Sequence, residues 1–406
     1  MNDLGLVLVG VGLFPYNVAG DKNFFTRLIP LLAKGCRSID VLSINDGSGS
    51  ERQELDGCRV TYHNTKRAFH LGDRSRYCCG QGSLLDYHHK HQPAREIAEI
   101  LLTTLAQLPK LRRLVRDGQV DAIHFMDNMG PSMRLVKRAL PGPMVTHSAM
   151  AYAPRGRFYD RYLQMSMRAL DRIIPYSQAY ATRLRDLGIA PGRIEVIRWG
   201  VEPREEELGE ADRSRVRSAY GVPQDARLLV WSGFIQQIGE ADFRAALEIA
   251  RKVTEARPNC RFIFAFKPKS FRPEFKSLAC PSVRVETNVE RFSELLEAAD
   301  LFYSPILRLD AIVAPPLTWL EAMSLGTPVI TTAAGGVDEV VRPGETGFVA
   351  RSHHDLADVV TRAVDCTELA EISQNCRRFI AENCDIHAVA ERYLTLWREG
   401  RSRPAP

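Results

Sequence analysis

The stretch "PPLTWLEAMSLGTPVITTAAGGVDEVV", residues 315–341, contains the alternation that decides the fold. A proline-stopped loop leads into a helix-like run that carries one carboxylate, Glu321. We expect Thr318 to cap this helix, which would then begin near Trp319. A short β-branched strand follows, and a Gly-Gly turn at 335–336 leads into another helix-like run. Helix, strand, turn and helix in this order predict a parallel α/β sheet.

The same alternation extends through the rest of the chain in both directions. Buried-strand patterns in the first half are "LGLVLVGVG", "SIDVLSI", "VDAIHFMD", "PMVTHSA", "RIIPYS" and "RIEVIRW", and in the second half "RLLVWSG", "RFIFAFK", "VRVET", "LFYSPI" and "TPVITT". A charged segment with prolines at both ends, "GVEPREEELGEADRSRVRSAYGVPQDA", separates the halves. We therefore predict an α/β protein with two Rossmann-like, doubly wound domains, 1–200 and 201–375, facing a central cleft, and a C-terminal packing helix with a frayed tail at 376–406.

Composition narrows the class of protein. The chain has 406 residues, of which 45% are apolar and 25% charged, as in ordinary globular proteins. No apolar run approaches the ~20 residues that span a bilayer, and we interpret "LGLVLVGVGLF" as a buried strand and not a signal peptide. Nine scattered cysteines favour reduced thiols in the cytoplasm. A net charge of +5 without a long basic block does not favour nucleic acid, but a smaller anionic ligand fits.

The opening stretch also suggests chemistry. The backbone amides of residues 317–319 at a helix start can receive phosphate oxygens. Glu321, one turn further, could accept hydrogen bonds from the paired hydroxyls of a ribose; the alternative, a carboxylate that only complements the helix dipole, stays open. Gly335 and Gly336 permit close backbone approach to a second anion or sugar, or they simply form a tight turn.

The longer stretch that contains these residues resembles the carboxy-terminal signature of retaining nucleotide-sugar glycosyltransferases of family 4, which have the GT-B fold. It reads "EAMSLGTPVITTAAGGVDEVVRPGETGFVA". A glutamate-headed helix, a Gly-Thr-Pro-Val turn, a Gly-Gly-x-x-Glu step and a Gly-x-Thr-Gly-Phe hairpin occur in order. The resemblance extends to "DRIIPYSQAYATRLRDLGIAPGRIEVIRWGVEP", "VTHSA" and "VAGDKNFFTRLIPLLAKG". It implies an acceptor-binding first domain and a second domain that binds the nucleotide sugar.

The resemblance also implies roles for particular residues. His147 would face the sugar in the cleft as a catalytic residue, together with Asp310. The implied donor-binding residues are Gly20, Ser232, Gly233, Lys267, Thr287, Asn288, Ala314, Leu317, Thr318 and Glu321. The expected acceptor-binding residues are Lys22, Arg74, Arg76 and Asn128. No metal and no cofactor beyond the nucleotide diphosphate sugar are expected; a small molecule or glycan is the expected acceptor, and a homodimer stays open.

The chain departs from the family pattern at the donor site. Val313 stands eight residues before Glu321, where relatives usually have a glutamate, and Asp310 could replace it from three residues earlier. Phe234 and Ile238 stand where relatives have an arginine and a lysine that hold the diphosphate. We expect Lys267 to supply that charge, with Lys269 behind it.

A third departure is the segment "HNTKRAFHLGDRSRYCCGQGSLLDYHHKH", with five of the ten histidines. Cys78–Cys79 and His88, His89 and His91 do not reproduce a zinc-ligand spacing, so we favour an acceptor-side loop that uses Arg74 and Arg76.

The expected activity is metal-independent transfer of a glycosyl group with retention at the anomeric carbon. Two alternatives stay open at this point. The departures would suit a binding or partner protein that kept the fold and lost catalysis. A GT-B sugar epimerase would instead form product from the donor alone.

Overall fold

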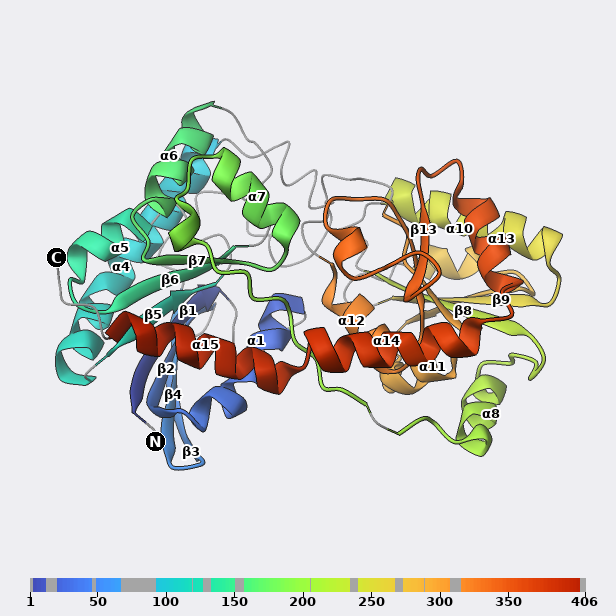
Figure 1. The fold of residues 1–406 in the computed structure, drawn as a ribbon, viewed down its shortest axis with the longest axis horizontal. Helices are drawn as coiled ribbons and strands as arrows, with labels where there is room; N and C mark the ends of the chain where they lie inside the picture. Colours follow the sequence, from blue (N-terminus) through green and yellow to red (C-terminus); the bar gives the residue numbers. More distant parts are fainter. Residues whose placement is uncertain are drawn as a thin grey trace. The chain divides into compact units, whose positions relative to one another are not determined.

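A computed structural model describes residues 3–11, 20–45, 49–66, 93–118, 120–126, 133–149, 157–204, 206–233, 240–266, 273–287, 289–306 and 315–401. These residues form two compact α/β units (Figure 1). The first unit contains the described residues up to Gly200 and, in addition, the chain from Ile386 onward. The second unit contains the described residues from Val201 to Asp385.

The first unit is built on a seven-stranded sheet in the order β3-β4-β2-β1-β5-β6-β7. Its strands are β1 (Leu4–Val11), β2 (Cys36–Asn45), β3 (Gly49–Leu55), β4 (Cys58–Lys66), β5 (Ala122–Phe125), β6 (Met144–Ala149) and β7 (Arg172–Pro175). All neighbours pair in parallel except β3 and β4, which form an antiparallel hairpin. Asp56 and Gly57 both have positive φ in its two-residue turn, as such hairpins require.

Helices cover both faces of this sheet (Figure 1). They are α1 (Gly20–Ala33), α4 (Pro93–Gly118), α5 (Met133–Ala139), α6 (Arg157–Met167), α7 (Gln178–Asp186), the short η2 (Pro191–Arg193) and α15 (Ile386–Arg401). Side chains of α4 to α7 form one apolar core with β1, β5 and β6. Helices α1 and α15 pack against each other, α1 against β2, and α15 against β6. The last helix of the chain is thus part of the first unit.

The second unit has a six-stranded, wholly parallel sheet in the order β10-β9-β8-β11-β12-β13. Its strands are β8 (Arg227–Gly233), β9 (Cys260–Phe266), β10 (Val283–Thr287), β11 (Leu301–Tyr303), β12 (Val329–Thr332) and β13 (Gly347–Ala350). Its helices are α8 (Glu210–Ala219), α10 (Glu240–Ala256), η4 (Pro273–Leu278), α11 (Phe292–Ala298), α12 (Leu317–Ser324), η5 (Val337–Glu339), α13 (Leu356–Val364) and α14 (Leu369–Asn383).

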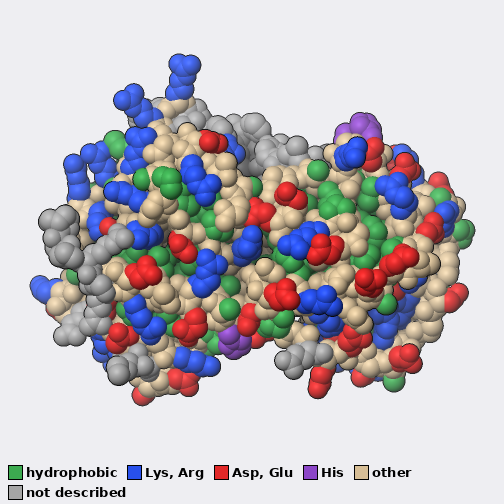
Figure 2. Space-filling model, viewed as in Figure 1, with side chains coloured by type: hydrophobic (Ala, Val, Ile, Leu, Met, Phe, Trp, Pro, Cys, Tyr) green, Lys and Arg blue, Asp and Glu red, His purple; other side chains and the backbone are tan. Residues whose placement is uncertain are grey.

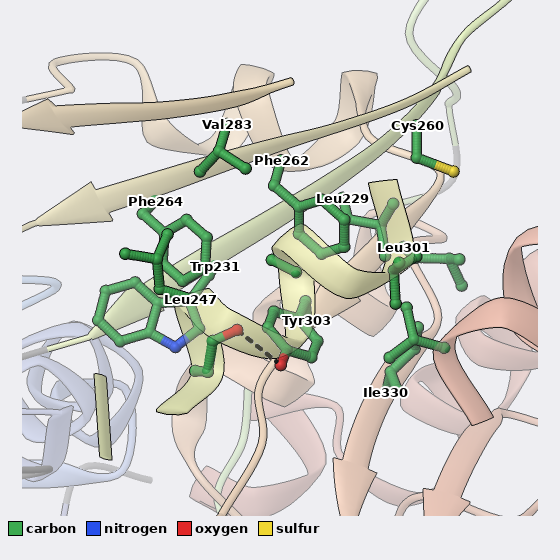
Figure 3. Close-up of a cluster of buried hydrophobic side chains, with 14 of the residues drawn as sticks. Leu229, Trp231, Leu247, Cys260, Phe262, Phe264, Val283, Leu301, Tyr303 and Ile330 are labelled. Atoms are coloured by element: carbon green, nitrogen blue, oxygen red, sulfur yellow. Dashed lines mark hydrogen bonds between the residues drawn. The ribbon is translucent and has the colours of Figure 1, made fainter. Parts of the chain in front are cut away.

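An aromatic-rich core holds this second sheet to α10 and α13. Figure 3 shows Trp231, Phe262, Phe264 and Tyr303 gathered over the strands, with the Tyr303 hydroxyl donating to the carbonyl of Ala246 at 3.1 Å. Helices α11, α12 and α14 pack with one another on the other face of the sheet. The predicted class, two parallel-sheet α/β domains, is confirmed.

The structure differs from the sequence interpretation in two elements. The predicted strand "RIEVIRW" forms only a single bridge, Ile173 to Ile194, although the amides of Glu195 and Ile197 donate to β7 carbonyls. Pro175 has no N–H to donate in return, so the ladder cannot continue. The hairpin of β3 and β4 was not predicted at all.

The C-terminal region 376–406 divides between the two units. Helix α14 ends at Asn383 within the second unit, and α15, which coincides with the expected packing helix "DIHAVAERYLTLWREG", begins at Ile386 in the first. Across the described part of the chain, no helix combines the length and the hydropathy required to cross a bilayer.

Candidate functional site

The start of α12 is the centre of the candidate site. The helix begins at Leu317 with Pro316 as its N-cap and no side-chain capping bond, and the Pro316 carbonyl accepts the Trp319 amide at 2.9 Å. Thr318 is therefore the second residue of the helix, and the prediction that it caps a helix starting near Trp319 is wrong. The proline carbonyl closes the first turn two residues earlier than expected. Among the described residues, no group accepts the amide hydrogens of Leu317 and Thr318.

Side-chain hydrogen bonds hold this helix start at the carboxyl edge of the sheet. Trp319 is fully buried, and its indole Nε1 donates to Ser304 Oγ at 2.7 Å, directly after β11. The Ile306 amide donates to Thr332 Oγ1 at the end of β12 at 3.0 Å, and that hydroxyl donates to the Ile306 carbonyl. Ligands of parallel α/β sheets bind at this edge, so α12 presents its free amides where a ligand is expected.

Hydrogen bonds also fix the C-terminal end of α12. The amides of Gly326 and Thr327 donate to the carbonyls of Met323 at 3.0 Å and Ala322 at 2.9 Å, which is the Schellman pattern. Gly326 has φ 79°, which favours glycine. Arg377 of α14 donates to two carbonyls at the end of α12, at 3.3 and 2.6 Å. With both ends fixed, the direction of each side chain on α12 is fixed too.

Thr318 and Glu321 share one face of this helix. All other residues of α12 are buried, whereas these two are partly exposed. Residues three apart lie next to each other on a helix surface. The structure therefore brings the predicted ribose ligand, Glu321, to the same face as the predicted phosphate ligand, Thr318.

The Gly335–Gly336 turn follows the neighbouring strand β12. Gly336 has φ 83° and is the N-cap of η5, a single 3-10 turn and not the longer helix that the pattern predicts. A Cβ at Gly335 would meet none of the described atoms within 4 Å. Backbone conformation thus explains Gly336, whereas packing does not explain Gly335. Open space beside Gly335 is what close approach of a ligand would need.

The ends of three further strands line up along the same sheet. Gly233 of β8 pairs with Phe266 of β9, which pairs with Thr287 of β10. Ser232, Gly233 and Thr287 are partly exposed, as donor-binding residues should be. Gly233 has a packing reason as well, since a Cβ there would lie 2.5 Å from the Trp231 indole. Lys267 follows Phe266 in the sequence but lies outside the described residues.

In the first unit, His147 occupies the fourth position of β6 and is 4% exposed. It lies between Phe125 of β5 and Ile173 of β7 in the sheet register. Gly20 is the first residue of α1, and Lys22 lies in its first turn. Gly20, an expected donor-binding residue, therefore lies at a helix N-terminus.

Several predicted site residues cannot be located. Besides Lys267, the structure does not describe Asn288, Ala314, Asp310, Arg74, Arg76 and Asn128. The positions that depart from the family pattern, Val313, Phe234 and Ile238, also lie outside the described residues. Of the histidine-rich segment, residues 63–66 belong to β4, where His63 Nε2 lies 2.8 Å from Asp40 Oδ1, and the rest, with Cys78–Cys79, His88, His89 and His91, lies outside the described residues. No cluster of potential metal ligands occurs among the residues that are described.

The thiols of the described residues are structural groups. All seven cysteines in this part of the chain are free. Burial raises the pKa of the Cys36 thiol to about 12 and the pKa values of Cys58 and Cys260 to about 11. A thiol with such a pKa is protonated at neutral pH and is a poor nucleophile.

Sequence reasoning missed the polar residues that support the site. Ser304 holds the start of α12 through Trp319, Thr332 holds Ile306 after β11, and His124 of β5 is fully buried between two hydroxyls of β6. A signal was available for Ser304 and Thr332, because both polar residues stand at the end of an apolar strand. His124 had no such signal, because its partners are distant in sequence.

Comparison with known proteins adds the following. Residues 226–366 match a family model described as "Glycosyl transferases group 1", and residues 53–205 match "Glycosyltransferase Family 4". A D-inositol 3-phosphate glycosyltransferase of Paenarthrobacter aurescens is 24% identical over 418 residues, covering 95% of this chain and 94% of that protein. D-inositol 3-phosphate glycosyltransferase 2 of Catenulispora acidiphila is 29% identical over 230 residues, 51% of this chain; the chain spans 51% of that relative's length.

Solved structures share the fold over nearly the whole chain. Sucrose-phosphate synthase from Thermosynechococcus elongatus has a TM-score of 0.72 at 16% identity and covers 98% of this chain and 99% of its own. WaaG, a glycosyltransferase involved in lipopolysaccharide biosynthesis, has a TM-score of 0.64 at 17% identity, covering 96% and 99%. Anabaena HepE in complex with UDP-glucose has a TM-score of 0.65 at 14% identity, covering 97% and 99%.

Proposed function

Because this chain belongs to the glycosyltransferases of the family 4 type, which have the GT-B fold, we propose that it transfers a glycosyl group from a nucleotide diphosphate sugar to an acceptor, with retention at the anomeric carbon. The observation that carries this proposal is the geometry of α12. Two backbone amides point out of its N-terminus, and Glu321 follows on the same face as Thr318. An anionic group and a ribose can be bound together there.

The donor is bound in three parts under this proposal. The amides of Leu317 and Thr318 receive diphosphate oxygens, helped by the positive end of the helix dipole and by Lys267. Glu321 accepts hydrogen bonds from the ribose hydroxyls. Thr287 and Asn288 flank the base, and the open space at Gly335 accommodates the sugar or phosphate.

These groups also support departure of the diphosphate. Preorganised amides and a lysine stabilise charge that develops on the leaving oxygen, so the donor site supplies positive charge without a metal ion. His147 and Asp310 act on the sugar near the reacting carbon. The leaving phosphate accepts the proton of the acceptor nucleophile on the same face of the sugar, and no protein base is required.

The acceptor is proposed to be a small molecule or a glycan that contacts Lys22, Arg74, Arg76 and Asn128. The basic side chains in this group suit a phosphorylated acceptor. The curated relatives described above are named for D-inositol 3-phosphate, so this compound is the first acceptor to test.

The test combines binding with turnover. Nucleoside diphosphates should raise the melting temperature, because a ligand at 100 times its Kd stabilises the native state by about 2.7 kcal/mol. The protein is then incubated with nucleotide sugars, with and without D-inositol 3-phosphate or a glycan panel, and products are identified by mass spectrometry and NMR. Product of inverted configuration would refute retention, and activity only with added divalent metal would refute metal independence.

The same experiment separates the alternatives. Formation of product from the donor alone would indicate an epimerase. Tight nucleotide binding with no product across the donor and acceptor panels would favour a binding protein, and absence of any nucleotide binding would refute the donor site itself.

A further inference from the structure

A closed polar network lies inside the first unit, on the sheet face that α15 covers. His124 of β5 is fully buried, with its Nδ1 2.8 Å from Thr146 Oγ1 and its Nε2 2.7 Å from Ser148 Oγ. Both hydroxyls belong to β6 and are also buried. One imidazole therefore bridges two side chains on the same face of the neighbouring strand.

The C-terminal helix completes this network. Trp397 Nε1 donates to Thr146 Oγ1 at 3.2 Å, and the Tyr393 hydroxyl lies 3.5 Å from Ser148 Oγ. Both aromatic rings contact the imidazole edgewise, with centroids 5.6 Å from that of His124. The network thus joins β5, β6 and α15, which are far apart in the sequence.

The following arrangement of hydrogens satisfies every bond of the network. Indole N–H can only donate, so Thr146 Oγ1 accepts from Trp397 and can donate its own hydrogen to Nδ1 of His124. Nε2 of His124 then carries the proton and donates to Ser148. This tautomer is assigned from the network. Burial, and next the charge of His147, lower the pKa of His124 well below its usual range, so the ring is neutral.

Strand geometry connects the network to His147. Side chains alternate along a strand, so Thr146 and Ser148 point to one face of the sheet and His147, between them, to the other. The register places Phe125 beside His147 and His124 beside Thr146. Holding the side chains on both sides of His147 holds the backbone from which the His147 ring projects.

We propose that His124 is a positioning residue for His147, acting through the hydroxyls of Thr146 and Ser148, and that α15 takes part through Trp397 and Tyr393. This role rests on the proposed function of His147 in glycosyl transfer. Groups that orient a functional histidine commonly change activity by about 10- to 100-fold when they are replaced.

The test uses changes that preserve volume. His124→Phe keeps an aromatic ring in place and removes both hydrogen bonds. We expect kcat to fall about tenfold or more while the KM for the donor changes less than about twofold. In ¹H–¹⁵N spectra of histidine-labelled protein, the His147 ring signals, assigned by their loss in His147→Gln, should shift. Tyr62→Phe, which removes a buried hydrogen bond on β4 in the same unit, should change neither kcat nor those signals.

A second pair of variants covers the case in which His124→Phe does not fold. Thr146→Val removes the hydroxyl at nearly constant volume, whereas Thr146→Ser keeps it. The serine variant should keep the wild-type His147 signals and the wild-type kcat. In the valine variant the His147 signals should shift and kcat should fall. Unchanged His147 signals in both His124→Phe and Thr146→Val would overturn the proposal. The spectra read out positioning without turnover, so inactivity of the wild-type protein would count against the proposed function alone.

Discussion

At the residue scale, most of the family signature in residues 321–350 serves folding. Thr346 is fully buried, accepts the Arg342 amide at 2.9 Å and donates to the Val340 carbonyl at 2.8 Å. A Cβ at Gly347 would lie 2.3 Å from the Val329 carbonyl oxygen, so only glycine fits. Glu321 is different, because it lies on the exposed face of its helix. Most residues of the signature therefore indicate the fold, and very few of its residues indicate the chemistry.

The proposed roles of Glu321 and Lys267 can be separated by comparing a ligand that has phosphates with one that has none. Glu321→Ala should weaken binding of the nucleoside and of the nucleoside diphosphate alike, by about 10-fold or more, because a hydrogen bond to a charged group contributes about 1.5–3 kcal/mol. Lys267→Ala should weaken the nucleoside diphosphate far more than the nucleoside, because the nucleoside has no phosphate. Isothermal titration calorimetry measures both.

The matched control for these variants is Glu248→Ala, which removes an exposed carboxylate paired with Lys252 at 3.2 Å on α10. Its affinities should equal those of the wild type. Unchanged nucleotide affinity in Glu321→Ala would exclude the ribose role, and equal losses of nucleoside and nucleoside diphosphate affinity in Lys267→Ala would point to a structural lysine.

The two adjacent glycines should respond in opposite ways. Gly336→Ala forces an L-residue into the left-handed region and should lower the free energy of unfolding by about 1–2 kcal/mol. Gly335→Ala meets open space and should leave stability unchanged, yet it should weaken nucleotide-sugar binding if the ligand approaches its backbone. Denaturant unfolding and calorimetry compare the pair. Full donor affinity in Gly335→Ala would remove this turn from the site.

At the element scale, the two ends of α12, whose start is the proposed donor-binding end, are fixed by their surroundings. The Trp319–Ser304 bond holds its start and the Schellman motif with Arg377 holds its end. Backbone amides at a helix start bind a ligand well when their direction is fixed before the ligand arrives. The conformational entropy lost in orienting them is then lost during folding and not during binding.

The Trp319–Ser304 bond should matter for both stability and binding. Trp319→Phe leaves the Ser304 hydroxyl unpaired and should lower the free energy of unfolding by about 1–3 kcal/mol, with weaker nucleoside diphosphate binding. Adding Ser304→Ala should recover part of the stability because the orphaned hydroxyl is gone. A double-mutant cycle with no coupling between the two positions would contradict this account.

At the scale of the whole molecule, the chain forms the first unit, then the second, and its last helix packs in the first unit again. The second unit is complete with α14, and α15 adds Tyr393 and Trp397 to the first unit, both fully buried. On the face that Figure 2 shows, acidic and basic side chains are spread over both units. The C-terminal helix is therefore a structural part of the unit that carries His147.

Loss of α15 packing should affect one unit selectively. Trp397→Ala should cost the first unit about 3–5 kcal/mol, as expected for removal of a buried indole. Hydrogen exchange measured by mass spectrometry should show faster exchange in β5, β6 and α1 and unchanged protection in β8 and β12. Equal loss of protection in both units would show that they unfold as one cooperative body.

Sequence patterns by themselves determined the two parallel α/β units, most strand positions and the candidate donor residues at α12, because hydrophobic periodicity and glycine turns are local properties. They misplaced the start of α12 and the strand at 193–199, since a proline carbonyl and a proline without N–H altered the hydrogen bonding there.

Only the tertiary structure decided which distant residues meet. The sharing of one helix face by Thr318 and Glu321, the support from Ser304 and Thr332, and the bridge of His124 to two hydroxyls near α15 all depend on packing. No periodicity records such contacts, because they join segments that are far apart in the chain and become neighbours only when both sheets have formed.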